Sequence, residues 1–289
     1  MVKVDFTECP RVPGRAYNGA NGKKIAVEWQ GACWMLKFPP SAAEQPNALS
    51  YSNSCYSEYL ASSIFKLLGI PVQEVQLGTF TNGKTKVVCA CRDFTAGGKV
   101  LHDFCSIKNS VLNSDSNGTG TELSTVVEAI DGQVFVDPVE VRRFFWDMFV
   151  ADAFLGNFDR HNGNWGFLVD PATGKAEIAP VFDCGSCLLP QADESIMRKV
   201  LDDKAELEAR IYTFPSSMLK ENGVKINYAK FLSVPNEELA SALGRIVPRI
   251  ELTTINRLVD ETPYLTDLQR EFYKTYLAAR KKGLFGKEV

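Results

Sequence analysis

The segment "GNFDRHNGNWGF", residues 156 to 167, places short polar side chains between bulky apolar ones. Asp159 is followed five positions later by Asn164, and Asp183 comes nineteen positions further on, in "PVFDCGS". An aspartate can accept or orient the proton of an attacking hydroxyl, and the oxygens of Asp and Asn are ligands that Mg²⁺ prefers. The spacing predicts phosphoryl transfer, with Asp159 at the hydroxyl and the other two residues at the metal.

The phosphates of a nucleotide also need a cation, and Lys37 is the candidate. It follows an apolar stretch in "CWMLK", so its ammonium must be directed at a partner. Glu58, in the next helical segment, is expected to pair with this lysine and to fix its position, as in the lysine–glutamate pair of kinases. The strand "VVCACRDF" is expected to be a hinge whose backbone at Cys89, Ala90 and Cys91 meets adenine.

Two elements must bring the three polar residues together. A strongly apolar helix is predicted from Pro138, with Asp137 as its cap, and it delivers the chain to Asp159. A hairpin around "DPATG" begins just after Asn164 and ends just before Asp183. Because a hairpin returns the chain to its starting point, we expect Asn164 and Asp183 to lie side by side.

The rest of the chain divides into a strand-rich part and a helical part. Strands are expected in residues 23–29, 33–40, 72–80 and 84–94, and a helix over 53–68. Residues 106–122, rich in Ser, Asn and Gly, are expected to form a flexible connection, and residues 190–289 are predominantly helical. We therefore expect an α+β fold, with a small sheet and one helix over 1–95 and a larger, mostly helical part over 96–289.

Composition limits the class of protein. The chain has 289 residues and a formal net charge of -3, which argues against a general nucleic-acid binder. Neither a long apolar run nor a signal-peptide core is present in the sequence, so we expect no stable membrane insertion and a cytoplasmic location. Export as an effector without a classical signal stays open. The eight cysteines are interpreted as reduced thiols.

The order of these motifs resembles the HipA-like and CtkA-like bacterial serine/threonine kinases. That family has an N-x-D-x-H-x-x-N catalytic loop and a P-x-x-D metal motif. The matching positions are Asn157, Asp159, His161 and Asn164 in the loop, and Pro180 to Asp183 in the metal motif. The resemblance implies a two-lobed protein-kinase-like fold that uses ATP and Mg²⁺, with Asn157 near the nucleotide and His161 as an orienting catalytic-loop residue. It also implies a protein substrate with Ser or Thr hydroxyls, including the chain itself.

Other interpretations of the loop stay open. "DRHNGN" also resembles the D-R-H-N-x-N loop of phosphatidylinositol kinases, which implies a lipid or small-molecule acceptor. A pseudokinase that binds nucleotide or a partner without turnover is a third possibility. The glycine-rich turn Asn18–Gly22 is a candidate for covering the phosphates, and the hydroxyl-rich residues 41–57 are a candidate self-target.

Simpler structural explanations exist for each motif. Asp159 and Asn164 taken alone are ordinary turn residues. Cys184 and Cys187 have the spacing of a metal or redox pair, and "CAC" at residues 89–91 offers further ligands for zinc. Small buried thiols are the simpler interpretation of these cysteines. The sequence does not predict the oligomeric state.

Overall fold

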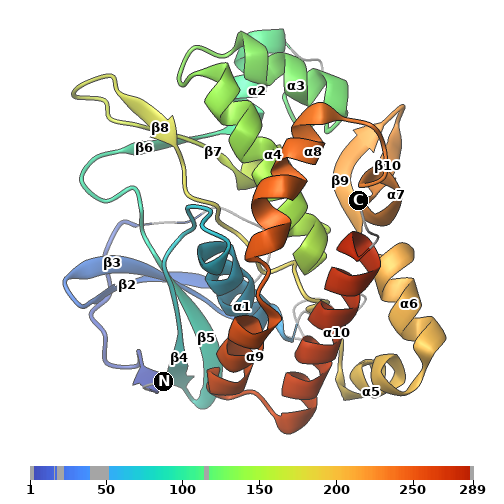
Figure 1. Ribbon diagram of the computed structural model, residues 1–289. Coiled ribbons are helices and arrows are strands. Elements are labelled where there is room, and N and C mark those ends of the chain that lie inside the picture. The colour runs from blue at the N-terminus through green and yellow to red at the C-terminus, as the bar shows by residue number, and fades with distance from the viewer. Residues whose placement is uncertain (1–2, 16, 18–22, 40–51, 114–116, 287–289) are drawn as a thin grey trace.

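The computed structural model describes residues 3–15, 17, 23–39, 52–113 and 117–286. Within these ranges the N-terminal part forms a five-stranded sheet in the order β1-β4-β5-β3-β2 (Figure 1). The strands are β1 (Val4–Asp5), β2 (Lys24–Trp29), β3 (Ala32–Lys37), β4 (Val75–Asn82) and β5 (Lys84–Arg92). β1 pairs with β4 in parallel and the other neighbours are antiparallel. The four strands expected in this region are confirmed, and β1 is an addition.

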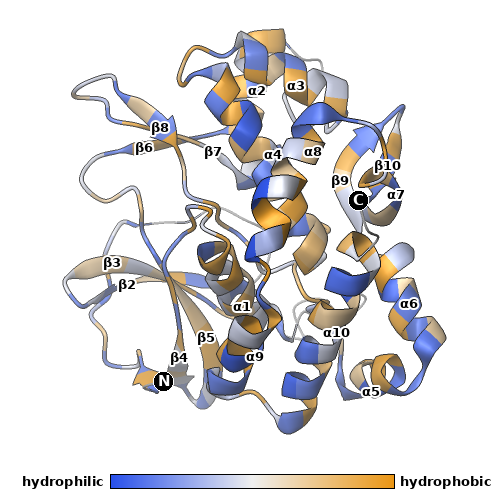
Figure 2. Ribbon diagram, in the orientation of Figure 1, coloured by the Kyte–Doolittle hydropathy of each residue, from blue (hydrophilic) through white to orange (hydrophobic). Residues whose placement is uncertain are grey.

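The helix α1 (Ser54–Leu67) packs against β4 and β5. Leu60 and Ile64 of the helix and Leu77 of the sheet are buried in one core cluster. Each such side chain contributes roughly 1.5–3 kcal/mol when it is fully buried. Figure 2 shows hydrophobic residues along much of β5 and α4. This packing fixes α1, which carries Glu58, relative to β3, which carries Lys37.

The helix α4 (Pro138–Leu155) is the predicted central helix. The Asp137 carboxylate accepts a hydrogen bond from the Val139 backbone N–H at 3.0 Å, as expected for its cap. Gly156 ends the helix with a left-handed φ of 67°, and a Cβ there would lie 2.2 Å from the Tyr276 hydroxyl. Only glycine satisfies both constraints, so the chain turns sharply out of α4 into the polar loop.

A second sheet of the described chain has the order β6-β7-β8. Its strands are β6 (Val100–Asp103), β7 (Gly166–Val169) and β8 (Ala176–Ile178). β7 and β8 form the hairpin predicted between the polar loop and Asp183. The short 3₁₀ helix η1 (Asn162–Asn164) precedes β7.

The remaining elements are mostly helical. They are α2 (Phe104–Leu112), α3 (Leu123–Gly132), α5 (Glu194–Asp202), α6 (Lys204–Tyr212), β9 (Ser216–Glu221), β10 (Val224–Asn227), α7 (Tyr228–Phe231), α8 (Glu237–Ile246), η2 (Val247–Arg249), α9 (Leu252–Glu261) and α10 (Asp267–Phe285). One expectation is corrected here. The first residues of the expected flexible connection belong to α2, because Phe104 and Ile107 pack into the core. Residues 190–289 are predominantly helical, as expected, and also contain the β9–β10 hairpin.

The architecture is the expected α+β arrangement of a small sheet with one helix beside a larger helical part (Figure 1). Among the residues that the structure describes, no helix has the length and apolar character needed to cross a bilayer.

Candidate active site

A cavity of about 650 Å³ receives residues from β2, β3, α1, η1 and the segment after β8. Six residues predicted from the sequence line it: Lys37, Glu58, Asp159, His161, Asn164 and Asp183. The glycine-rich turn Asn18–Gly22 and residues 41–51 of the expected self-target lie outside the described residues. The folded chain therefore gathers, at one cavity, charged residues that are 146 positions apart in the sequence.

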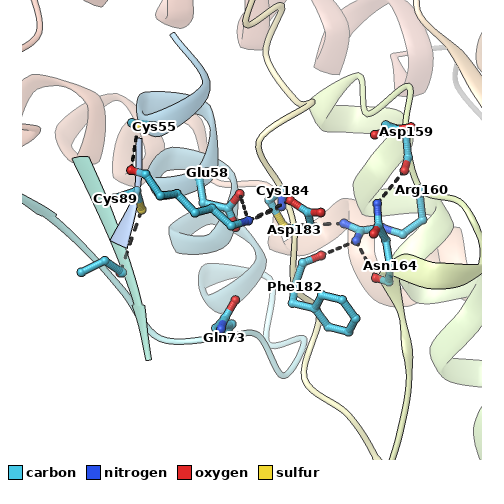
Figure 3. A network of polar contacts seen from close by, with 12 residues as sticks. Cys55, Glu58, Gln73, Cys89, Asp159, Arg160, Asn164, Phe182, Asp183 and Cys184 are labelled. Atoms are coloured by element: carbon cyan, nitrogen blue, oxygen red, sulfur yellow. Dashed lines mark hydrogen bonds and ion pairs between the residues drawn. The ribbon is translucent and has the colours of Figure 1, made fainter. Parts of the chain in front are cut away.

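Lys37 is held between two carboxylates. Its Nζ donates to Glu58 Oε2 at 2.8 Å and to Asp183 Oδ1 at 2.7 Å, and Figure 3 shows the surrounding network. Burial opposes the charge on this ammonium, but the two carboxylates more than offset it and raise the pKa of Lys37 well above its ordinary value. The expected ion pair between Lys37 and Glu58 is present, and Asp183 forms a second ion pair with the same lysine.

Asp183 reaches this position through two short connections. Val181 forms a parallel bridge with Val72, and the Gln73 N–H donates to the Val181 carbonyl at 2.8 Å. The Cys184 N–H donates to Glu58 Oε1 at 3.1 Å. The segment that follows the hairpin is thereby joined to the first half of α1 and to the connection between α1 and β4. Glu58, which is buried, uses one carboxylate oxygen for this backbone and the other for Lys37.

A buried ion pair between Arg160 and Asp152 anchors the polar loop to α4. Arg160 Nε donates to Asp152 Oδ2 at 2.9 Å, and both side chains are at most 5% exposed. Arg160 Nη1 also donates to the carbonyls of Asn164, at 2.9 Å, and Phe182, at 2.5 Å. One guanidinium therefore connects α4, the polar loop and the residue before Asp183.

Asn157 differs from its expected position near the nucleotide. Its Nδ2 donates to Asp152 Oδ1 at 2.8 Å, and its Oδ1 accepts from the Asp159 N–H at 3.0 Å. The side chain is buried and does not belong to the cavity lining. We therefore correct the expectation: Asn157 shapes the loop beneath Asp159 and does not face the cavity.

Asn164 and Asp183 have the donor set that Mg²⁺ prefers. Asn164 Nδ2 donates to the Asp159 carbonyl at 2.9 Å, which leaves the amide oxygen as the acceptor at the cavity. The Asp183 side chain is 44% exposed, and one of its oxygens is bonded to Lys37. An amide oxygen and a carboxylate fit Mg²⁺, which is usually held by one or two carboxylates together with phosphate oxygens. Roles at the metal remain predictions for both residues.

Asp159 and His161 both line the cavity. The pKa of Asp159 is raised above its ordinary value. Burial is the main cause, the neighbouring His161 opposes it, and the charge of Asp183 adds to it. His161 Nδ1 accepts from the Gly163 N–H at 3.0 Å, which fixes the imidazole against its own loop. A carboxylate with a raised pKa beside an open cavity suits proton acceptance, and the histidine has the orienting contact that was expected.

The residues expected to form the hinge do not line the cavity. Cys89, Ala90 and Cys91 are fully buried, and each pairs with β4 on one side and β3 on the other. Their backbone groups are used in the sheet, so they cannot contact adenine, and the expectation is wrong at these positions. The cavity is instead lined by residues 93–95, immediately after β5 ends.

Several cavity residues were not predicted from the sequence. They are Arg15, Tyr17, Lys24, Asp93, Phe94 and Phe182, among others. Arg15 Nε donates to Asp93 Oδ2 at 2.7 Å, and the rings of Phe94 and Phe182 lie 5.6 Å apart. Phe94 directly follows Arg92–Asp93 and Phe182 directly precedes Asp183, so both phenylalanines could have been predicted from their sequence neighbours. No comparable local signal marks Arg15.

The cysteines behave as small core residues. Cys89 and Cys187 are fully buried, and burial raises the pKa of both thiols. A raised pKa disfavours the thiolate form that binds metals. In the described part of the chain, no group of three or more His, Cys, Asp or Glu side chains is placed to hold a metal ion. These observations favour the buried-thiol interpretation over a zinc site.

The ion pair at Lys37 has a consequence for acid stability. The Lys37 charge, against the opposing effect of burial, lowers the pKa of Asp183 to about 2, from about 3.9 in an unfolded chain. A depressed folded-state pKa stabilises the fold above the unfolded value, and this contribution is lost as the pH falls from about 4 to about 2. We expect the free energies of unfolding of wild type and Asp183→Asn to differ at pH 6 and to converge by pH 2. Urea unfolding in EDTA measures the difference, and a gap independent of pH would contradict the assignment.

The fold and this cavity define a class: a two-lobed protein-kinase-like protein with a lysine–glutamate–aspartate centre. The HipA-like C-terminal domain model matches residues 16–255, which is most of the chain. The chain therefore belongs to the HipA-like family.

Two relatives extend this comparison. The chain is 47% identical over 286 residues to a protein of Helicobacter pylori named serine/threonine-protein kinase CtkA, covering 98% of this chain and 87% of the relative. The crystal structure of a Helicobacter pylori proinflammatory kinase CtkA matches with a TM-score of 0.92 and 46% identity, covering 98% of this chain and 96% of that one. HipA of Shewanella oneidensis, solved with HipB and operator DNA, matches with a TM-score of 0.55 and 20% identity, covering 96% of this chain and 66% of HipA. That last likeness concerns the fold alone.

Proposed function

We propose that this protein is an ATP- and Mg²⁺-dependent kinase that phosphorylates serine or threonine hydroxyls of proteins. The observation that carries the proposal is the Lys37 ammonium held between Glu58 and Asp183 in a cavity that Asp159 and Asn164 also line. The relative at 47% identity is named a serine/threonine-protein kinase. Kinase chemistry needs this combination of cation, metal ligands and hydroxyl-orienting acid.

The nucleotide would lie along the cavity with its base at residues 93–95. Phe94 and Phe182 line this end, and their apolar rings suit the face of adenine. Lys37 binds phosphate oxygens and Glu58 keeps its ammonium in place. The position of residues 93–95 supports a boundary near residue 95 between an N-lobe, 1–95, and a C-lobe, 96–289.

Asp183 and Asn164 would hold the metal. When bound there, Mg²⁺ would offset the negative charge that develops during transfer. Asp159 accepts or orients the proton of the attacking hydroxyl, and its raised pKa supports this role. His161 and Asn157 hold the backbone of the loop so that the carboxylate keeps its direction.

The acceptor is proposed to be a protein, including the chain itself. The name of the Helicobacter pylori relative supports a protein substrate. A cytoplasmic location and the lack of nucleic-acid partners remain predictions from the sequence.

The test offers two acceptors in parallel. Purified protein is incubated with labelled ATP and Mg²⁺ together with a generic basic protein or with phosphoinositide vesicles, and mass spectrometry locates the phosphate. We expect label on Ser or Thr residues, and a rate about 100-fold lower for Asp159→Asn because the proton acceptor is lost. Label on the lipid alone would replace the proposal by lipid phosphorylation. Tight ATP binding without any transfer would favour a pseudokinase.

A further inference from the structure

Lys24 is the first residue of β2 and stands directly opposite Lys37 on β3. Opposite residues of antiparallel strands project from the same face, with Cβ atoms roughly 5 Å apart. Both lysines line the cavity. Like charges directly opposite each other destabilise a sheet, and the Glu58 and Asp183 carboxylates beside Lys37 counter this repulsion.

The lysine pair lies at the end of the cavity away from the hinge. The Asp93 N–H donates to the Cys33 carbonyl at 2.9 Å, which places the start of β3 beside the hinge. Lys37 is four residues further along this strand, roughly 13 Å away at about 3.3 Å per residue. A nucleotide whose base is at the hinge therefore extends its phosphates toward Lys24 and Lys37.

The charges that line the cavity do not favour a triphosphate. Among the described lining residues, the carboxylates Glu58, Asp93, Asp103, Asp159 and Asp183 face the cations Arg15, Lys24 and Lys37. Arg15 is bonded to Asp93 at the hinge end, and Lys37 is bonded to two carboxylates. The pKa of Lys24 is lowered, mainly by burial. The charge of Asp183 opposes this shift and the charge of Lys37 adds to it, so the Lys24 ammonium interacts with the same charged residues as Lys37 does.

We propose that Lys24 is a second phosphate-binding residue, which contacts the terminal phosphates of the nucleotide beside Lys37. The inference rests on the proposed kinase function and names a residue for it. Lys24 reaches the same centre as Lys37 from the neighbouring strand. Its ammonium donates a charge-assisted hydrogen bond to a phosphate oxygen. The role is binding and positioning, and no bond to Lys24 forms or breaks.

Calorimetric titrations with adenosine and with MgATP test the proposal. Lys24→Met is expected to weaken MgATP binding by about 10- to 100-fold, the range of one charge-assisted hydrogen bond, and to leave adenosine binding unchanged. Unchanged adenosine binding also reports that the variant is folded. Lys24→Arg keeps the charge and is expected to recover most of the ATP affinity. Lys23, the exposed neighbour just before β2, provides the matched control, and Lys23→Met is expected to bind both ligands as wild type does.

Two results would overturn the role of Lys24. One is a Lys24→Met variant that binds MgATP as tightly as wild type, and the other is an equal loss of adenosine and MgATP. A wild-type protein that binds neither ligand would overturn both this inference and the proposed function. Wild-type binding of MgATP with no effect of Lys24→Met would overturn this inference alone.

Discussion

Replacing Asp183 by asparagine is expected to slow phosphate transfer from ATP by about a thousandfold or more. In the proposed metal site this carboxylate would supply negative charge to the metal, and loss of roughly 4 kcal/mol of transition-state stabilisation corresponds to this factor. The substitution preserves shape. Asp183 has a left-handed φ of 57°, a conformation that asparagine tolerates better than most residues, so the variant is expected to fold. Single-turnover transfer of labelled phosphate measures the rate.

Asp170→Asn is the matched control for this experiment. Asp170 lies in the turn between β7 and β8, where its carboxylate accepts from the Ala172 N–H at 2.9 Å, and it is not part of the cavity lining. The same chemical change there is expected to leave the rate at the wild-type level. If Asp183→Asn stays within tenfold of wild type while binding MgATP normally, Asp183 does not hold the metal.

The sequence was sufficient for the part of the site that depends on local geometry. A helix with a clear cap leads to Asp159, and a hairpin with a clear turn leads from Asn164 to Asp183. Hairpin closure is set by turn residues that a single sequence displays, so the approach of Asn164 and Asp183 was predictable. The pairing of Lys37 with Glu58 also needed only one strand, one helix and the kinase precedent.

The register of the β2–β3 hairpin also bears on the site. The two-residue turn at Gln30 and Gly31 pairs Trp29 with Ala32. Five residues further along each strand, the same register pairs Lys24 with Lys37. Because a short turn fixes the pairing of a hairpin, the position of Lys24 at the cavity was implied by the sequence.

The place where the chain after β5 reaches the cavity, at residues 93–95, and the helix α2 both depend on tertiary contacts. Cys89, Ala90 and Cys91 are flanked by β4 and β3, and the point at which β5 leaves the sheet depends on the lengths of these neighbours. The Ser and Asn residues of α2 favour loops locally, but Phe104 and Ile107 bury an apolar face that overrides this preference. The residue pattern of one segment predicts neither the length of the neighbouring strands nor the core that buries Phe104 and Ile107.

Arg160 shows the same limit in the interior. Arginine is seldom fully buried, so an exposed side chain is the default from sequence. Here a carboxylate eight positions earlier, on α4, and two backbone carbonyls compensate the buried charge. These partners exist only after α4, the polar loop and the segment before Asp183 have packed together.

Replacing Arg160 by methionine is expected to lower the free energy of unfolding by about 3–5 kcal/mol. The variant leaves Asp152 as a buried carboxylate without its cation, which is the costly way to break such a pair. Urea unfolding followed by circular dichroism measures the change. Arg142, which is more exposed and pairs with Asp131 and Glu238, provides the control, and Arg142→Met is expected to change stability by about 1 kcal/mol at most. Equal effects of the two variants would contradict a structural role for the buried pair.

Combining Arg160→Met with Asp152→Asn separates stability from positioning. The double variant removes the uncompensated charge, so we expect it to recover much of the lost stability. Transfer is expected to stay about 100-fold slower than in wild type, because the Asn164 and Phe182 carbonyls still lack the donor that joins them, and small displacements of reacting groups cost this much. Recovery of rate together with stability would mean that Arg160 serves the fold alone. A stable but slow double variant would identify Arg160 as the positioning residue that holds the two segments of the proposed metal site, at Asn164 and at Asp183, next to each other.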